Sequence, residues 1–418
     1  MSQDLIKRSN KRAWLVLVGC CFLQMAGLGT VLNSSAAFFA VVPDALGLSM
    51  GSFALWIAMY AVAAVLILPV VGNMFPKYDI RILLTVATLV CGICVGMFSM
   101  ATELWHFLVL GFVLGLSGGS IFLYPTPVLI GNWFETKKGL MTGIAMTFSG
   151  IGGAIFPIVF TALMPKIGWE GAYIFNAVIL LVMILPFTIF VFRFKPADVG
   201  LVPYGYSENN SQTSTVDASK MPGVSVKTAV KSIAFVFALV ACGFMAFYGA
   251  YNSYMIAFAM SVGQTAVFGA SLMTALQLGY IISTPLAGAM ADKIGAKGTG
   301  VILIVVMILC FLSFITLHSA IALMITAFFF GSNNSLVTVV GPLFVREIFG
   351  GKDFARIYSY ASMAVGLIGG LGATIVGSFY DKTGTYSTGF IAGIIAAIII
   401  LVFMFMASGS GKRLVWDK

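Results

Sequence analysis

The stretch Gly288–Lys297, GAMADKIGAK, lies between two long apolar runs and indicates how the chain reverses at a membrane surface. The run before it covers about 266–287 and the run after it about 300–316. Each is close to the roughly 20 residues that a membrane-spanning helix requires. The stretch is therefore predicted to be a short loop between two membrane helices. Asp292 falls at the C-terminal end of the first helix, where the helix dipole disfavours an anion, so we expect a nearby cation or helix N-terminus to anchor it.

A weaker copy of this loop precedes it in GNMFPKYDIR, residues 72–81. The two copies are 216 residues apart (288 − 72), and this offset pairs Gly72, Lys77 and Arg81 with Gly288, Lys293 and Lys297. The same offset pairs seven of the 20 glycines up to Gly171 with another glycine, whereas 46 glycines in 418 residues predict about two such pairs. Self-similarity at a fixed period is typical of a duplicated structural unit.

The composition is that of a polytopic membrane protein, because 60% of residues are hydrophobic and only 9% are charged, against about 25% charged in soluble domains. Twelve apolar runs are predicted to be membrane helices, at 13–40, 50–72, 82–101, 104–129, 139–162, 171–192, 230–259, 266–289, 300–317, 320–344, 357–379 and 387–408. We therefore predict an all-α fold of two pseudo-symmetric six-helix bundles, 1–192 and 230–418, joined by a cytoplasmic linker at 193–229.

Lysine and arginine predict the orientation, since both collect in cytoplasmic loops. On the predicted topology, 21 of the 23 lie on the face that carries both termini, and only Lys166 and Lys382 lie on the other. We expect a multi-pass protein of the cell membrane with cytoplasmic termini. The net charge of +9 fits this rule and an anionic inner leaflet, and no nucleic-acid partner is expected.

The predicted membrane interior contains no Asp, Glu, Lys or Arg. Proton relays and counter-ions for anionic solutes normally appear as ionisable residues within the spans. Metal-ligand clusters, catalytic carboxylate pairs and nucleophile triads are also missing from the sequence, so we expect neither an enzyme nor a metal or organic cofactor. For a transporter, this pattern favours exchange or facilitated diffusion ahead of proton symport.

Neutral polar and aromatic residues recur inside the spans and share helix faces. In 266–289, for example, Gln277, Tyr280 and Thr284 follow one face. Such residues bind a solute or join helices through hydrogen bonds, and their convergence favours a solute site. The candidate solute-binding residues are Asn33, Tyr124, Tyr251, Asn252, Gln277, Tyr280, Thr284, Asn333, Asn334 and Tyr358.

The loop at 288–297 resembles the signature loop of the major facilitator superfamily, whose transporters consist of two six-helix halves. The resemblance covers nearly the whole chain and implies alternating access to a site near the middle of the bilayer, between the halves. It also implies that the two loop copies form a cytoplasmic gate. Its residues are Gly72, Lys77, Arg81, Gly288, Asp292, Lys293, Gly295 and Lys297.

Two segments narrow the resemblance. NWFETKKGLMTGIAMTFSGIGG (132–153) and PADVGLVPYG (196–205) are similar to segments of the monocarboxylate transporters and the bacterial oxalate:formate antiporters. This implies a monomeric carrier of small organic anions, working by exchange, facilitated diffusion or proton-linked transport. The chain departs from those families at Thr284-Pro285, where they carry an arginine before the proline. A neutral or amphipathic solute therefore stays open as an alternative, as does a membrane sensor that transports nothing.

Overall fold

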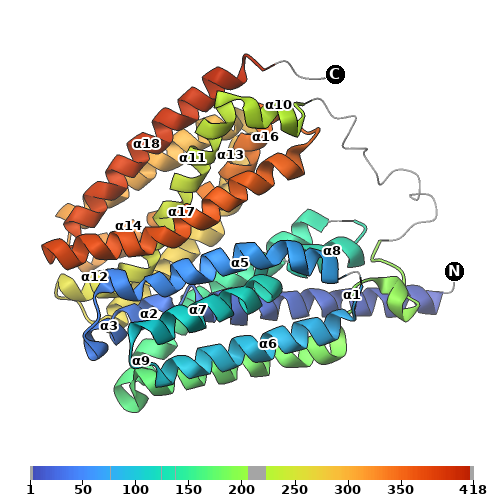
Figure 1. Ribbon diagram of the computed structural model, residues 1–418, viewed down its shortest axis with the longest axis horizontal. Coiled ribbons are helices and arrows are strands. Elements are labelled where there is room, and N and C mark those ends of the chain that lie inside the picture. Colours follow the sequence, from blue (N-terminus) through green and yellow to red (C-terminus); the bar gives the residue numbers. More distant parts are fainter. Residues whose placement is uncertain (1–2, 76, 124, 137, 206–222, 415–418) are drawn as a thin grey trace. The chain divides into compact units, whose positions relative to one another are not determined.

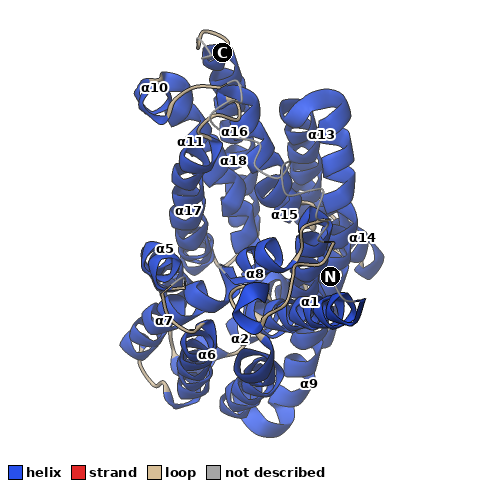
Figure 2. Ribbon diagram, turned by 90° about the vertical axis from the view of Figure 1, so that its right-hand side faces the viewer, coloured by secondary structure: helices blue, strands red, loops and turns tan. Residues whose placement is uncertain are grey.

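The computed structural model describes residues 3–75, 77–123, 125–136, 138–205 and 223–414. Within these ranges the secondary structure is helical, with no β-strand (Figure 2). The chain divides into two compact units, each with its own core. Unit 1 comprises Met1–Leu46 and Met59–Gln212, and unit 2 comprises Gly47–Ala58 and Thr213–Lys418.

Unit 1 contains most of the helices that are coloured blue to green in Figure 1. They are α1 (Gln3–Gln24), η1 (Met25–Gly29), α2 (Ser35–Phe39), α3 (Val42–Leu46), most of α5 (Leu55–Met74), α6 (Ile80–Met97), η2 (Phe98–Met100), α7 (Leu104–Gly118), η3 (Gly119–Leu123), α8 (Pro125–Trp133), α9 (Lys138–Pro186), η4 (Phe187–Val191) and η5 (Pro196–Val199). The first membrane helix therefore begins about ten residues before the predicted start at residue 13.

Unit 2 contains one short helix from the first third of the chain and all helices after residue 223. They are α4 (Met50–Phe53), α10 (Val226–Lys231), α11 (Ile233–Phe247), η8 (Tyr248–Tyr254), α12 (Met255–Ser261), α13 (Ala266–Thr316), α14 (Ala320–Phe330), α15 (Asn333–Ser335), η9 (Leu336–Val340), α16 (Gly341–Phe349), α17 (Phe354–Thr383) and α18 (Ser387–Gly411).

Ten helical stretches of the described chain are long and apolar enough to cross a membrane. Two of them, Leu140–Val191 and Ala266–Thr316, have 52 and 51 residues, more than twice the length that crosses a bilayer. Each is interrupted by one glycine with non-helical backbone angles, Gly168 (φ 72°) and Gly295 (φ 77°). Each is therefore a helical hairpin of two crossings, and the twelve predicted spans are confirmed.

The internal repeat is visible in the backbone. Helix α8 and helix α16 coincide at both ends under the offset of 216 residues (125 + 216 = 341 and 133 + 216 = 349). The left-handed glycine Gly47 pairs with Gly263, and Gly168 pairs with Gly384 (φ 64°, 82°, 72° and 69°). Because only glycine adopts this conformation without strain, each half reverses its chain at the same points. The predicted pseudo-symmetry is confirmed.

Two of the membrane helices contain a widened π-helical turn at related places in the repeat. These are η3 in unit 1 and η9 in unit 2, and each directly precedes a helix whose first or second residue is proline, Pro125 or Pro342. Proline lacks a backbone N–H and its ring crowds the carbonyl four residues earlier. This explains why the ladder of hydrogen bonds changes there. In contrast, Pro285 lies inside α13 without a break.

Glycines bring the helices of unit 2 into direct backbone contact. A Cβ at Gly279 would collide with the carbonyl oxygen of Phe328, and a Cβ at Gly331 would collide with that of Leu276. The two glycines thus face each other across α13 and α14. Small residues permit this close approach, and packing drives helix association in a membrane.

A carboxylate explains why residues 47–58 group with unit 2. Asp381, near the end of α17, accepts hydrogen bonds from the backbone N–H of Met50 (2.9 Å) and of Gly51 (2.8 Å) at the start of α4. A Cβ at Gly51 would come within 2.9 Å of the backbone nitrogen of Ser378. A helix start carries unpaired N–H groups and partial positive charge, so an anion is stabilising there.

We predict that Gly279→Ala destabilises the protein, because the added methyl group forces α13 away from the Phe328 carbonyl. Overpacking of this kind costs about 1–3 kcal/mol, which thermal unfolding of the purified protein in detergent would detect. Gly288→Ala in the same helix is the matched control, since a Cβ there meets nothing within 4 Å. Equal melting temperatures for the two variants would contradict the close contact.

Candidate solute-binding site

A cluster of hydroxyl groups joins the first half of α13 to α15 in unit 2. The Oγ1 of Thr284 donates to the carbonyl oxygen of Tyr280 (2.8 Å) and lies 3.1 Å from the Oγ of Ser335. Ser283 lies 2.7 Å from the same Ser335 oxygen. Thr284 therefore belongs to a network of neutral groups. Tyr280 extends this network, because its phenol faces the Thr338 hydroxyl.

A pair of asparagines continues the polar surface from α15 to η8. The amide nitrogen of Asn333 donates to the Oδ1 of Asn252 (3.3 Å) and to the carbonyl oxygen of Phe330 (2.9 Å). The Oδ1 of Asn333 is buried and has no partner among the described residues. Asn252 and Asn333 were predicted as site residues from separate helices, and the structure brings their side chains together.

Two further amides in this region have no side-chain partner within the described part of the chain. Gln277 is only 3% exposed and makes no hydrogen bond through its amide, and Asn334 is half-buried with its side chain equally unpaired. The polar atoms of both side chains retain some accessible surface. These groups therefore remain available to a ligand, and they lie on the helices that carry Thr284 and Asn333.

Two predicted residues of unit 2 have other surroundings. The hydroxyl of buried Tyr251 donates to the carbonyl oxygen of Gly389 (2.7 Å), and its ring packs between Phe311 and Phe390. Its polar atom is thus already occupied, and the contact joins η8 to α18. Tyr358 stacks on Phe354 in the first turns of α17, apart from the amide and hydroxyl cluster in sequence.

Unit 1 holds its own buried polar contacts. Asn33 donates from its amide to the carbonyl oxygen of Ser149 (3.0 Å) and so ties the turn before α2 to α9. Tyr124 lies outside the described residues. Gln24, fully buried, donates to the Phe122 carbonyl oxygen (2.8 Å) in the π turn η3 and to the hydroxyl of Thr126 (2.9 Å). These two bonds join α1 to η3 and α8.

Charged residues of the described spans lie near helix ends or at the two hairpin reversals. The described residues contain no group of three or more His, Cys, Asp or Glu that would suit a metal ion. The cluster in unit 2 therefore consists of amides, hydroxyls and aromatic rings, which recognise a ligand through hydrogen bonds and apolar contact.

The loop of unit 2 that the sequence predicts to form a cytoplasmic gate is held by Glu347 of α16. Its Oε2 accepts from the backbone N–H of Ala296 (2.8 Å) and of Lys297 (3.3 Å), the first residues after the reversal at Gly295. Asp292 is exposed and, in the described part of the chain, has no hydrogen bond or ion pair. The contact expected of Asp292 is thus made here by a different carboxylate.

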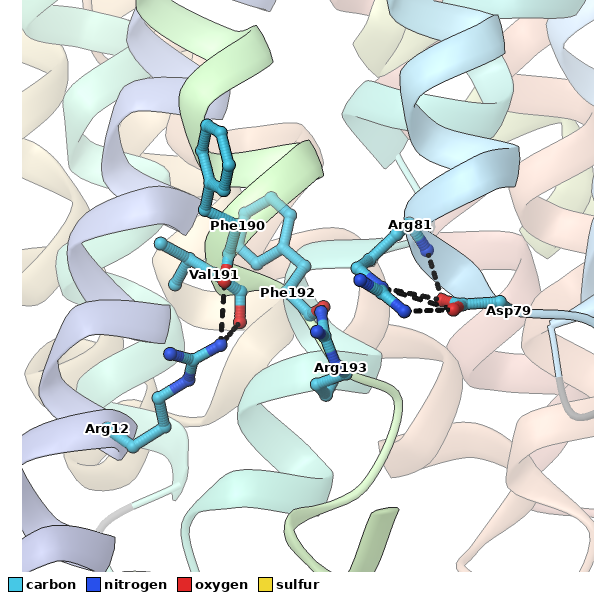
Figure 3. Close-up of polar contacts among 7 residues, drawn as sticks. All are labelled: Arg12, Asp79, Arg81, Phe190, Val191, Phe192 and Arg193. Atoms are coloured by element: carbon cyan, nitrogen blue, oxygen red, sulfur yellow. Dashed lines mark hydrogen bonds and ion pairs between the residues drawn. The ribbon is translucent and has the colours of Figure 1, made fainter. Parts of the chain in front are cut away.

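The other residues of the predicted gate lie in or next to the two copies of the loop. Lys293 is exposed, Lys297 places its Nζ 3.9 Å from the centre of the Phe405 ring, and Gly288 lies within helix α13. In unit 1, Gly72 lies in α5 and Lys77 is exposed. There Asp79 forms an ion pair with Arg81 (2.7 Å), shown in Figure 3, and the hydrogen bond from Arg81 lowers the pKa of the Asp79 carboxyl.

Sequence reasoning missed Ser283, Ser335 and Glu347. Ser283 is next to Thr284 and Ser335 is next to Asn334 in the sequence. The position of each serine beside a predicted site residue could therefore have indicated it. Glu347 lies 50 residues after Lys297, and nothing in its local pattern indicates which helix start it contacts.

Comparison with known proteins places the chain among transporters. The family model described as Major Facilitator Superfamily matches residues 17–272 and 233–415. An MFS-type transporter of Gibberella moniliformis is 23% identical over 363 residues, which cover 84% of this chain and 81% of the relative. The Fujikurins efflux protein of Gibberella fujikuroi is 29% identical over 163 residues, 38% of this chain and 35% of the relative.

Solved transporters share the fold. A bacterial homologue of the human lysosomal transporter Spinster, inward-facing and unoccupied, has a TM-score of 0.73 at 17% identity, with 100% of both chains covered. The nucleoside transporter NupG has a TM-score of 0.71 at 15% identity, covering 96% of this chain and 100% of its own. At these identities the likeness concerns the fold alone.

We predict that Glu347→Ala speeds hydrogen exchange at the backbone amides of Ala296 and Lys297 about fivefold, as expected for losing about 1 kcal/mol of hydrogen bonding. Hydrogen-exchange mass spectrometry of the purified protein measures this. Asp292→Asn is the matched control and should leave both amides unchanged. Faster exchange in the control alone would assign the anchoring role to Asp292.

Proposed function

The chain belongs to the major facilitator superfamily of membrane transporters, and we propose that it moves a small organic solute by alternating access, with organic acids as the first candidates. The solute would be held through hydrogen bonds by the neutral cluster of unit 2. The proposed binding residues are Asn252, Gln277, Tyr280, Thr284, Asn333 and Asn334, together with Asn33, Tyr124, Tyr251 and Tyr358 from the sequence prediction.

The observation that carries this proposal is the set of unpaired amides in a region without charge. Gln277 and Asn334 have no side-chain partner in the described chain, and the Oδ1 of Asn333 is buried and unpaired. A ligand that supplies both donors and acceptors would satisfy these groups. A protonated organic acid has one hydroxyl donor and one carbonyl acceptor, and it enters such a region without the cost of a desolvated charge.

Organic acids are favoured by the two segments that resemble the monocarboxylate and oxalate:formate carriers. These segments contact each other in unit 1. The Trp133 carbonyl oxygen accepts from the N–H of Tyr204 (2.8 Å), and the Tyr204 carbonyl oxygen accepts from the N–H of Glu135 (2.9 Å). The two resembling segments therefore form part of the scaffold of unit 1 and are not proposed to contact the solute. They support an organic acid only because related carriers would share a class of solute.

A neutral or amphipathic solute is the second candidate, and the charge-free cluster favours it directly. Thr284 stands where the resembling families carry arginine, and its hydroxyl already contacts Ser335. One relative bears the name of an efflux protein for fujikurins, which supports export of an organic product as the direction of transport.

Several finer proposals accompany this function. We propose that the protein is a monomer in the cell membrane. We propose that both termini are cytoplasmic, because 21 of the 23 Lys and Arg lie on the same predicted side of the membrane as the termini. The six-helix bundles would be 1–192 and 230–418, joined by 193–229. Exchange or facilitated diffusion is favoured over proton symport, since the cluster offers no group that changes its charge in the physiological pH range.

We predict that Gln277→Ala lowers solute uptake into proteoliposomes about fivefold, the effect of one lost hydrogen bond of about 1 kcal/mol. The assay offers lactate, formate and oxalate beside a panel of neutral organic solutes. Gln264→Ala, a glutamine in the turn before α13, is the matched control and should transport normally. Unaltered uptake of every transported solute by the Gln277 variant would remove this residue from the site. If the native protein transports none of the solutes, the result would favour a membrane sensor.

We predict that counterflow of the transported solute does not require a pH gradient, because the unit 2 cluster contains no carboxylate or histidine. Liposomes loaded with unlabelled solute and given labelled solute outside measure this, with and without an imposed gradient. Accumulation driven by the gradient, for a solute that has no proton to lose or gain, would contradict the prediction and indicate proton symport.

A further inference from the structure

We propose that a cavity at the lysine- and arginine-rich end of unit 1 binds the phosphate group of an anionic phospholipid, and that a related cavity in unit 2 forms a second site of the same kind. Neither cavity includes a residue of the solute cluster. The proposal therefore concerns how lipid contacts the protein and does not depend on which solute is carried.

The cavity of unit 1 has a volume of about 390 Å³ and is formed by the start of α6 and the segment after η4. Its lining includes four cations and two carboxylates. The cations are Lys77, Arg81, Arg193 and Lys195, and the carboxylates are Asp79 and Asp198. The lining is thus positively charged overall, which suits an anion.

Both carboxylates are already engaged. Asp79 pairs with Arg81 (2.7 Å), and Asp198 accepts a hydrogen bond from the backbone N–H of Lys195 (2.9 Å). Arg193 has no carboxylate partner in the described chain and donates only to the carbonyl oxygen of Phe192 (2.8 Å). Burial, and then the neighbouring Arg81, lower the pKa of Arg193. Asp79 and Asp198 act on Arg193 electrostatically, but neither forms an ion pair with it, so its guanidinium can still bind a phosphate.

Figure 3 shows that the neighbouring cation Arg12 donates hydrogen bonds to backbone carbonyl groups at a helix end. Its guanidinium donates to the carbonyl oxygens of Phe190 (2.7 Å) and Val191 (2.9 Å) at the end of η4. Arg12 thus satisfies helix-end carbonyls, whereas Arg193 is the guanidinium left for an external anion. Guanidinium binds phosphate through paired hydrogen bonds.

The apolar surface next to the cavity favours a lipid over soluble phosphate. Ile82, one residue after Arg81, is 65% exposed, and Phe190, three residues before Arg193, is 70% exposed. Both belong to membrane-spanning segments, so apolar side chains exposed to lipid adjoin the cationic lining. A ligand with a phosphate and acyl chains would meet both surfaces.

The internal repeat supplies the second observation. A cavity of about 600 Å³ in unit 2 is lined by Lys297, Glu347, Lys412 and residues of 408–414. Lys297 lies 216 residues after Arg81 (297 − 81), and 408–414 corresponds to 192–198, where unit 1 carries Arg193 and Lys195. Glu347 is engaged by the backbone of Ala296. Both halves thus have a cation-lined cavity at related places, in which Arg81 and Lys297 are equivalent, whereas Lys412 corresponds to Pro196.

The test is native mass spectrometry of the full chain in detergent, titrated with dioleoylphosphatidylglycerol or with dioleoylphosphatidylcholine. We expect two phosphatidylglycerol molecules to bind tightly, and phosphatidylcholine to bind more weakly. Arg193→Gln and Lys412→Gln should each weaken one of the two sites about fivefold, since one cation near an anionic surface contributes about that factor. The double variant should weaken both sites. Lys166→Gln, a lysine on the opposite predicted face, is the matched control and should bind as the native chain does.

Melting temperatures of all variants without lipid show whether each one is folded. For a variant that does not fold, Lys195→Gln for unit 1 or Lys297→Gln for unit 2 replaces it. Equal binding of the two lipids, or unchanged phosphatidylglycerol binding in the double variant, would overturn the proposal. Displacement of the lipid by millimolar inorganic phosphate would identify a soluble-anion site instead and would also overturn it.

Discussion

The need to satisfy backbone polar groups without water governs this structure. A bilayer core offers no partner for an N–H or C=O group, so each span must be helical and each helix end must find a partner within the protein or at the surface. The described chain meets this need with charged side chains at the reversals. Glu347 and Asp381 accept from helix starts, and Arg12 donates to the end of η4.

The same constraint explains where charge is found. Carboxylates and guanidinium groups serve helix ends near the membrane surfaces, and the described interior retains only amides, hydroxyls and rings. These neutral groups have two different roles. Tyr251 and Gln24 bond to backbone carbonyls and hold helices together, whereas Gln277 and Asn334 lack side-chain partners in the described chain. Gln24 and Asn176 of unit 1 also keep a buried oxygen without a partner among the described residues, so the candidate site is distinguished by several such groups on neighbouring helices of unit 2.

The duplication in the sequence is also visible in the backbone of the two halves of the chain. Glycines in the left-handed conformation reverse the chain at Gly47 and Gly263 and again at Gly168 and Gly384. Helices α8 and α16 begin and end at equivalent residues. Each unit also has a cation-lined cavity, and Arg81 and Lys297 in these cavities follow the same offset. A feature that occurs in both copies has a cause in the repeated fold, whereas the hydroxyl network of Ser335 is specific to unit 2.

The sequence alone determined the class of fold, the twelve spans and the repeat, because hydrophobic length, glycine spacing and charge position are local properties that a bilayer enforces. It also indicated the face shared by Gln277, Tyr280 and Thr284, since helical periodicity fixes which side chains align. Tertiary structure alone decided which polar groups are already satisfied. The contact of Glu347 with Ala296 and that of Tyr251 with Gly389 join residues 51 and 138 positions apart, and such pairings depend on how the helices pack.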